Sequence, residues 1–244
     1  MRNVKAVVEY DGTDYFGFQR QSRRRTIQGE LESALTLVMK EPVRVVGASR
    51  TDTGAHARGQ VISFKTTCGI PIERMCVALN SALPPNIVLA DAEEVGPDFH
   101  ARYSALLRTY EYLILNAERP SAMFGRFTWH VPGKLNLAAM RRAATHLVGT
   151  HDFSAFSTSR RDGKSAVRSL TALDIRKRSD VVTFVLTANG FLHGMVRGIV
   201  GTLVEVGQGR RKPDDVKTIL DSKDRSAAGK TAPARGLCLI KVAY

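Results

Sequence analysis

The spacing of apolar residues changes along the first ninety positions, and this change limits the chain to a fold that mixes helices and strands. Val4 to Tyr10 alternate apolar and other residues, which is the period of a strand, and Asp11-Gly12 ends the run. Between Thr26 and Lys40 the apolar residues return at helical spacing, and Pro42 marks the end. A helix is therefore expected directly after the first strand.

The rest of the first half continues the same alternation. Strands are predicted over Val43–Ala48 and Gln60–Phe64, a second helix over Ile72–Leu79 and a short strand over Ile87–Leu89. The resulting order is β-α-β-β-α-β, which is that of a ferredoxin-like unit.

The second half is predicted to repeat that order. The predicted strands are Arg108–Leu115, Val167–Ile175, Val181–Leu186 and Leu237–Val242, and the predicted helices are Leu137–Leu147, Leu192–Val206 and a short one opened by Pro213. We therefore expect an α+β chain of two tandem ferredoxin-like units with antiparallel sheets. Residues 1–104 and 105–244 would form the two domains, with the active site in a cleft between them. Ser157–Ser169 and Ser222–Gly236 are expected to be exposed loops.

The charge of the chain indicates a polyanionic partner. Lys and Arg number 36 against 23 Asp and Glu, a formal net charge of +13. Nucleic acid is the first candidate, because basic residues set against phosphates release counterions, and an anionic membrane surface is the second. A soluble basic surface without a partner is the third interpretation. The basic residues are spread over several clusters, which suits a large folded polyanion: Arg23–Arg25, Arg141-Arg142, Arg160, Arg161, Lys164, Arg168 and Arg210–Lys212.

Cysteine usage and hydropathy predict a cytoplasmic protein. Cys68, Cys76 and Cys238 form no CxxC pair, and three cysteines cannot all pair within one chain. The N-terminus lacks the apolar core of a signal peptide, and no apolar run approaches the roughly 20 residues that span a bilayer.

Common cofactor and metal motifs are absent from the sequence. Gly229-Lys230-Thr231 looks like the end of a phosphate loop, but Asp224 stands where the first glycine of that motif is required. No GxGxxG, HExxH, GxSxG or metal-spaced cysteine pair occurs, so neither a cofactor nor a metal is predicted. His56 and His193 are isolated, and such histidines are usually structural.

The strongest candidate for a functional residue is Asp52, which lies within GASRTDTGAHARGQV and between Arg50 and Arg58. One interpretation is structural, because Asp-Thr-Gly is typical of a turn in which Gly54 takes a positive φ. The other is chemical: a loop between two strands presents an ionised carboxylate, which can act as a nucleophile without an added base.

The stretch Ser49–Ala57 resembles the RTDxGVHA signature of the tRNA pseudouridine synthases of the TruA type. Other segments match that family in the same order, over nearly the whole chain: Tyr10–Gly12, Phe16–Gln19, Phe99–Arg102, Arg108–Tyr112, His151–Phe156, Phe191–Arg197 and Ala234–Leu237. Ser49 replaces a common glycine and Ala55 a common valine, and neither change removes a functional group.

The resemblance implies isomerisation of uridine to pseudouridine at positions 38, 39 and 40 in the anticodon stem-loop of tRNA. It also implies a homodimer, tRNA as the partner and no cofactor. By the matching motifs, Asp52 would be the nucleophile, Tyr110 would lie against the flipped base and Arg197 would pair with Asp52. Arg50, Arg58 and His193 are the further candidates for RNA binding. Tyr112 is interpreted as an ordinary strand aromatic, and a surface pair of His193 and Arg197 on one helix face is the alternative for those two residues.

Two other functions stay open from the residues. Ferredoxin-like halves are similar to RNA-recognition domains, so the chain could be an RNA-binding module, although no RNP1-like sequence occurs. A metal-dependent nuclease could use Asp11, Asp14, Asp52 and His56, although these residues form no compact carboxylate cluster in the sequence.

Overall fold

A computed structural model describes residues 1–159 and 165–244 of the chain. The chain divides into two compact units. The first contains Met1–Leu106 together with Cys238–Tyr244, and the second contains Leu107–Leu237. The sequence predicted a division after residue 104 with the rest of the chain in one domain. The last strand lies instead with the first unit, because it hydrogen-bonds to a strand there.

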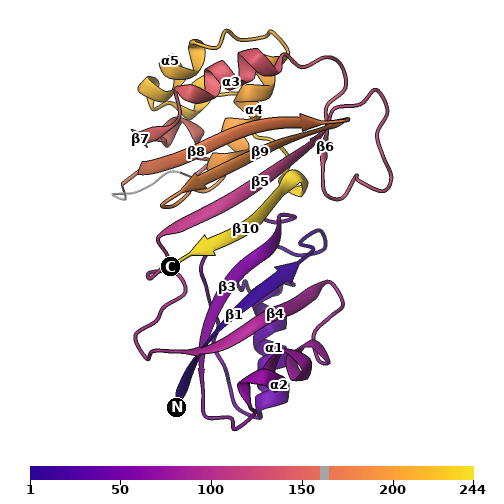
Figure 1. The fold of residues 1–244 in the computed structure, drawn as a ribbon, viewed down its shortest axis with the longest axis vertical. Coiled ribbons are helices and arrows are strands. Elements are labelled where there is room, and N and C mark those ends of the chain that lie inside the picture. The colour runs from indigo at the N-terminus through magenta and orange to yellow at the C-terminus, as the bar shows by residue number, and fades with distance from the viewer. Residues whose placement is uncertain (160–164) are drawn as a thin grey trace. The chain divides into compact units, whose positions relative to one another are not determined.

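The first unit is a sheet with two helices on one face (Figure 1). Strands β1 (Arg2–Tyr10), β3 (His56–Thr66) and β4 (Ile87–Val95) pair antiparallel in the order β4-β1-β3. The two-residue strand β2 (Val46–Gly47) pairs antiparallel with β3, and β10 (Leu237–Ala243) pairs parallel with it. The helices are α1 (Ile27–Met39) and α2 (Ile72–Asn80).

Local sequence explains where α1 begins and ends. The Thr26 hydroxyl accepts a hydrogen bond from the Gly29 amide and so caps the N-terminus. Lys40 closes the helix in a left-handed conformation, and its amide donates to the Thr36 carbonyl. The helix predicted between Thr26 and Lys40 is confirmed.

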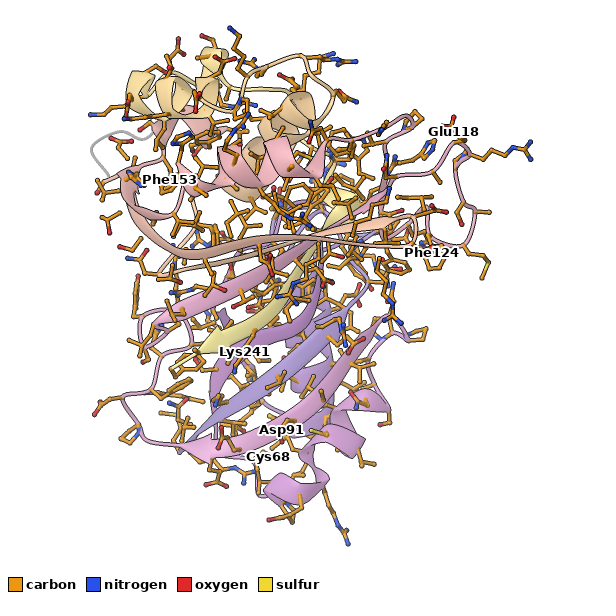
Figure 2. The ribbon with its side chains drawn as sticks, turned by 45° about the horizontal axis from the view of Figure 1, so that its top comes forward. Cys68, Asp91, Glu118, Phe124, Phe153 and Lys241 are labelled. Atoms are coloured by element: carbon orange, nitrogen blue, oxygen red, sulfur yellow. The ribbon has the colours of Figure 1, made fainter. Side chains whose placement is uncertain are left out.

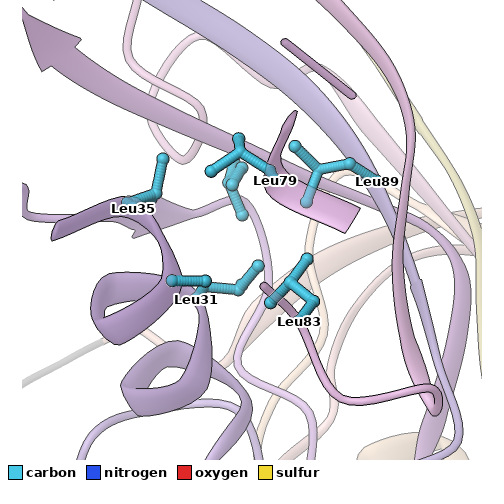
Figure 3. Close-up of a pocket in the computed structure, with 7 residues that line it drawn as sticks. Leu31, Leu35, Leu79, Leu83 and Leu89 are labelled. Carbon is cyan, nitrogen blue, oxygen red and sulfur yellow. The ribbon is translucent and has the colours of Figure 1, made fainter. Parts of the chain in front are cut away.

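Leucine side chains from both helices and from β4 form the core between the helices and the sheet. Figure 3 shows Leu31 and Leu35 on α1 facing Leu79 and Leu89, with Leu83 beside them. This cluster leaves no room for a water molecule. A dry, closely packed core gives the strands of the first unit a fixed base.

The second unit is also a sheet covered on one face by helices (Figure 1). Strands β5 (Leu107–Leu115), β7 (Gly149–Asp152), β8 (Val167–Arg178) and β9 (Val181–Ala188) pair antiparallel in the order β5-β9-β8-β7. The short strand β6 (Trp129–His130) pairs parallel with β5. The helices are α3 (Leu137–Thr145), α4 (Met195–Gly207) and α5 (Asp215–Ser222), and 3-10 turns occur at Ser154–Phe156, Arg225–Ala227 and Ala234–Gly236.

The structure corrects several predictions about the sheets. They are mixed rather than purely antiparallel, since β10 is parallel to β3 and β6 is parallel to β5. The second unit does not repeat the order of the first, because among the described residues only the 3-10 turn Ser154–Phe156, and no α-helix, separates β7, β8 and β9. Tandem ferredoxin-like units are therefore not confirmed, whereas the α+β class is.

Some boundaries also differ from those predicted. The strand expected over Val43–Ala48 is only two residues long, and the strand expected over Ile87–Leu89 extends to Val95. The extension was hidden by its acidic side chains, two of which pair with β1: Glu93 with Lys5 at 2.7 Å and Glu94 with Arg2 at 2.6 Å.

The connection between β5 and β6 carries exposed apolar side chains. Figure 2 shows Glu118 and Phe124 on the connection between β5 and β6, and Phe124 is exposed there together with Met123. Of the helices that the structure describes, none is long and apolar enough to cross a membrane.

Candidate functional site

Asp52 opens a tight turn in the connection between β2 and β3. The Ala55 amide donates to the Asp52 carbonyl at 3.1 Å, and Gly54 has a φ of 78°. The positive φ predicted for Gly54 is confirmed, and it is a conformation that side-chain-bearing residues rarely adopt. We call residues Asp52–Ala55 the Asp52 turn; the side chain of Asp52 is half-buried.

The segment that follows β1 packs directly against the Asp52 turn. The Phe18 amide donates to the Thr51 carbonyl at 3.1 Å, and the Gly54 amide donates to the Tyr15 carbonyl at 3.3 Å. A Cβ atom on Gly12 would lie 1.9 Å from the Ala55 carbonyl oxygen, so only glycine fits at this contact. The two segments therefore hold each other in one conformation.

Buried polar side chains fix the residues that precede Asp52. The Tyr10 hydroxyl is 2.8 Å from the Thr51 hydroxyl, and the Gln60 amide group donates to Tyr10 at 3.4 Å. The same Gln60 side chain bonds both backbone groups of Ser49, donating to its carbonyl at 2.7 Å and accepting from its amide at 3.1 Å. Tyr10 belongs to the matching segment Tyr10–Gly12 and Gln60 to the stretch around Asp52, but the sequence assigned a role to neither side chain.

His56 has a structural role in holding the chain beside the Asp52 turn. Its ring is buried, and Nδ1 accepts a hydrogen bond from the Gly12 amide at 3.1 Å. The Asp11 carboxylate accepts from the Thr13 amide at 3.0 Å and from the Thr13 hydroxyl at 2.5 Å. No group of three or more His, Cys, Asp or Glu side chains within residues 1–159 and 165–244 is arranged to hold a metal ion.

Arg50 and Arg58 are exposed on the two sides of the Asp52 turn. Arg58 extends from β3, and Arg50 lies in the loop before the turn, beside a cavity that Arg102 also lines. Partial burial lowers the pKa of Arg50 from its ordinary value, and the positive charge of Arg102 lowers it further. The loop that carries Asp52 is therefore flanked in sequence by two exposed arginines.

Tyr110 and Tyr112 on β5 of the second unit differ in their surroundings. The Tyr110 ring is nearly buried and meets the edge of Phe191, with the ring centroids 5.1 Å apart. Tyr112 is fully buried, its hydroxyl donates to the Pro233 carbonyl at 2.7 Å, and its ring packs against Trp129. Burial raises the pKa of Tyr112 well above its ordinary value, which is typical of a structural tyrosine.

Arg197 lies in the first turn of α4 and is oriented by a distant segment. Its Nε donates to the Ala232 carbonyl at 2.7 Å, and the Ala232 amide donates back to the Arg197 carbonyl at 3.1 Å. The predicted helix start at Leu192 is wrong, because Gly194 takes a left-handed φ of 70° and α4 begins at Met195. His193 is exposed and lies before the helix, so it does not share a helix face with Arg197.

The loop predicted to be exposed over Ser222–Gly236 is exposed only in part, because Ala228, Gly229 and Ala232 are buried while Ser222–Asp224 and Lys230 are exposed. The Gly229 amide donates to the Thr202 hydroxyl at 2.9 Å, and the Lys230 amide donates to the Glu205 carboxylate at 3.1 Å. Glu205 is in turn held by Arg211, whose Nε lies 2.6 Å away. We call residues Ala228–Ala232 the 228–232 segment; it lies along α4 and fixes the carbonyl that orients Arg197.

The structure assigns the site residues predicted from sequence to both units. Asp52, Arg50 and Arg58 belong to the first unit, and Tyr110, His193 and Arg197 belong to the second. Of the basic clusters, Arg23–Arg25 is exposed and Arg141 donates to the Ile175 carbonyl at 2.9 Å. Arg160, Arg161 and Lys164 lie outside the described residues.

Comparison with known proteins agrees with the family resemblance of the sequence motifs. The chain matches a family described as tRNA pseudouridine synthase over residues 6–104 and 143–244. It is 48% identical to tRNA pseudouridine synthase A of Acetivibrio thermocellus and 50% identical to that of Thermoanaerobacter sp. (strain X514), in both cases over the full length of both chains.

A third relative, tRNA pseudouridine synthase A of Halalkalibacterium halodurans, is 44% identical over 97% of this chain and 90% of its own length. Among solved structures, an archaeal box H/ACA sRNP Nop10-Cbf5 complex matches with a TM-score of 0.39 and 7% identity, over 98% of this chain and 48% of that chain. That structural likeness is too weak for a comparison of site residues. The matches in sequence extend over both units, and the chain belongs to the tRNA pseudouridine synthase family.

Proposed function

We propose that the protein is an isomerase that converts uridine to pseudouridine in tRNA, at positions 38, 39 and 40 of the anticodon stem-loop. The observation that carries this proposal is the Asp52 turn, which presents one carboxylate on a rigid loop between two exposed arginines, in a chain of this family. Such an arrangement suits a nucleophile that works beside RNA phosphates.

The reaction exchanges one bond to the sugar for another. The bond between uracil N1 and the ribose C1′ breaks, a bond between uracil C5 and C1′ forms, and the proton on C5 is lost while N1 gains one. Asp52 would form a transient covalent bond that keeps the two fragments together while the base turns, and its attack on either the sugar or the base satisfies this balance.

Tyr110 and Arg197 are the proposed partners of Asp52 in this reaction. The Tyr110 ring would stack on the flipped uracil, and its hydroxyl is the candidate group for handling the C5 proton. Arg197 would pair with the ionised Asp52 and keep it charged. The Nε contact of Arg197 with Ala232 supports this role, because it fixes the direction of the guanidinium group.

Exposed side chains that can contact phosphates would supply the affinity for RNA. Arg50, Arg58 and His193 are all exposed, and the whole chain carries a formal charge of +13. Contacts to phosphates position the RNA, and the energy that they provide offsets the cost of flipping the base, a few kcal/mol. A homodimer and a cytoplasmic location are parts of the same proposal, and the three free thiols are consistent with a reducing compartment.

A tritium-release assay tests the proposal directly. Unmodified tRNA labelled with tritium at uracil C5 is incubated with the protein in the presence of a chelator, and the label released to water is counted. We expect release by the wild-type protein. Asp52→Asn should reduce release by at least about 10³-fold, since removal of a covalent nucleophile removes the reaction path, while tRNA affinity stays within about threefold.

The other outcomes of this assay identify the competing functions. Binding without release in the wild-type protein would indicate an RNA-binding module. Strand cleavage that the chelator abolishes would indicate a metal-dependent nuclease. Loss of both binding and folding in Asp52→Asn, measured by thermal melting, would mean that Asp52 only stabilises the turn.

A further inference from the structure

A cavity of about 220 Å³ lies in the first unit beside the loop that carries Asp52. It is lined by β2 with Val45, by Phe18, Gln19 and Gln28, and by four residues that we call the rim: Arg50, His100, Arg102 and Tyr103. No residue that lines it is Asp or Glu. Pockets for drug-sized ligands measure about 300–1,000 Å³, so this cavity suits a single base or a phosphate group.

The cavity and the Asp52 turn share part of their structure. Arg50 lies on the cavity and is two residues before Asp52, and Phe18, which lines the wall, donates through its amide to the Thr51 carbonyl at 3.1 Å. A ligand in the cavity would therefore lie against the loop that carries Asp52. In the proposed complex with RNA, the candidate occupant is the nucleotide next to the one on which Asp52 acts.

The electrostatics of the rim favour an anion. Arg50 and Arg102 are close enough that the charge of Arg102 adds to the effect of burial in lowering the pKa of Arg50. Both guanidinium groups line the cavity, so a phosphate bound there could accept charge-assisted hydrogen bonds from both. Arginine is well suited to this task, because its planar group can donate two hydrogen bonds to one phosphate.

Two rings on the rim, Tyr103 and His100, stack on each other, and Tyr103 is exposed. Tyr103 is 79% exposed, and its ring stacks on His100 with centroids 4.4 Å apart and planes inclined by 28°. His100 Nδ1 accepts from the backbone amides of both Arg102 and Tyr103 at 3.2 Å, which fixes the His100 ring against the turn. The Tyr103 ring is thus stacked on His100, and the Arg102 guanidinium lies over the ring at 6.0 Å from its centroid, while Tyr103 remains largely open to solvent.

Several hydrogen bonds hold the turn that carries Tyr103. The Ser104 amide donates to the His100 carbonyl at 3.0 Å, and the Ser104 hydroxyl accepts from the His100 amide at 3.1 Å. The Ala101 amide donates to the Ser63 hydroxyl on β3 at 3.1 Å, and the Tyr244 hydroxyl donates to the Ala101 carbonyl at 2.8 Å. A large aromatic ring on a rigid turn, exposed beside two arginines, is typical of a stacking platform for a nucleic-acid base.

We infer that this cavity binds a second nucleotide of the RNA, adjacent to the uridine on which Asp52 acts, with its base on Tyr103 and its phosphate between Arg50 and Arg102. The inference rests on the proposed function, since it places the second nucleotide by reference to Asp52. The cavity would hold the strand beside the flipped uridine and so contribute to the choice of target position.

Equilibrium binding of unmodified tRNA tests the inference. Tyr103→Ala should weaken binding about five- to 140-fold, the effect of losing one stacked base. Tyr103→Phe keeps the ring and should bind within about twofold of wild type. The matched control is Val77→Ala on α2, which removes a side chain that is 75% exposed and does not line the cavity, and it should also leave binding unchanged.

A second measurement locates the bound nucleotide. A set of tRNAs, each lacking the base at one position on either side of the target uridine, is titrated with the wild-type protein and with Tyr103→Ala. At the position that stacks on Tyr103, the ratio of the two dissociation constants should fall to about one. A ratio that is unchanged at every position, or wild-type affinity for Tyr103→Ala, would overturn the inference.

Failure of this inference and failure of the proposed function have different signatures. The binding scan needs no turnover, so a scan that selects one position supports the cavity even if the protein releases no tritium. Normal tritium release together with unchanged binding by Tyr103→Ala would overturn the second-nucleotide site alone. Arg102→Gln adds an independent measure: the slope of log affinity against log salt should fall by about one if Arg102 contacts a phosphate.

Discussion

At the scale of single residues, the loop that carries Asp52 is held in place by hydrogen bonds from Gln60 and Tyr10. Gln60 bonds both backbone groups of Ser49, and Tyr10 reaches the Thr51 hydroxyl. These contacts are buried, where an unsatisfied polar group costs about 1–3 kcal/mol. They therefore restrict Arg50, Thr51 and Asp52 to one conformation before any substrate binds.

The close contact at Gly12 leads to a prediction about stability and activity together. In Gly12→Ala the new methyl group would overlap the carbonyl oxygen of Ala55, the last residue of the Asp52 turn. Overpacking of this kind costs about 1–3 kcal/mol, so the melting temperature should fall by several degrees. Tritium release should fall at least about tenfold, because the turn that presents Asp52 must move.

Gly69→Ala is the matched control for this substitution. A Cβ atom on Gly69 meets no atom within 4 Å, so both melting temperature and activity should stay near wild type. Wild-type activity of Gly12→Ala at a temperature where it is folded would mean that the packing between Gly12 and Ala55 is unimportant for the position of Asp52.

At the scale of elements, α4 and the 228–232 segment form one assembly that orients Arg197. Thr202 lies on α4, is fully buried, and bonds the Gly229 amide, while Glu205 on the next turn of the same helix bonds the Lys230 amide. The Gly229-Lys230-Thr231 sequence, which looked like part of a phosphate loop, thus helps to hold the carbonyl of Ala232 against Arg197.

Thr202→Val tests this positioning role. Valine keeps the shape of threonine but removes the acceptor for the Gly229 amide, which leaves a buried donor unsatisfied at a cost of about 1–3 kcal/mol. We expect kcat to fall about tenfold while KM changes less than threefold, because Arg197 would act on the reaction rather than on tRNA affinity.

Thr202→Ser separates positioning from packing. Serine keeps the hydroxyl that accepts from Gly229 and should restore kcat, although the lost methyl group lowers the melting temperature slightly. If Thr202→Ser and Thr202→Val reduce kcat equally, the hydrogen bond to Gly229 does not position Arg197.

At the scale of the whole molecule, the net charge is expected to set the salt dependence of RNA binding. The formal charge is +13, and its basic clusters lie on several loops and helix ends of both units. Such a distribution suits many phosphate contacts along a folded RNA. Each contact releases condensed counterions, so the free energy of binding depends on salt.

We therefore expect tRNA affinity to fall steeply as salt is raised. If about six phosphates are contacted, the dissociation constant should increase by roughly 10³-fold between 50 and 200 mM monovalent salt. Filter binding at constant pH across this range measures the slope. A nearly flat response would mean that the positive charge keeps the protein soluble and does not bind RNA.

Local signals in the sequence predicted some elements of the fold correctly and misplaced others. The helix that starts after Thr26 was predictable because its cap, its period and the proline beyond its end are local signals. The turn at Asp52 was predictable for the same reason, since Asp-Thr-Gly favours it in any context. The start of α4 was misplaced because nothing in the apolar pattern from Leu192 reveals that Gly194 takes a left-handed conformation.

The alternation of strands and helices, the Asp52 turn and the family could be predicted without coordinates, because they depend on short-range periods, turn chemistry and motifs in a fixed order. The structure was needed to find that the last strand joins the first unit, that the 228–232 segment packs on α4 and that Tyr103 lines the same cavity as Arg50 and Arg102. Each of these depends on contacts between residues far apart in the chain. Such contacts form because strand edges and buried amides must find partners, and a local pattern does not say which partner is nearest.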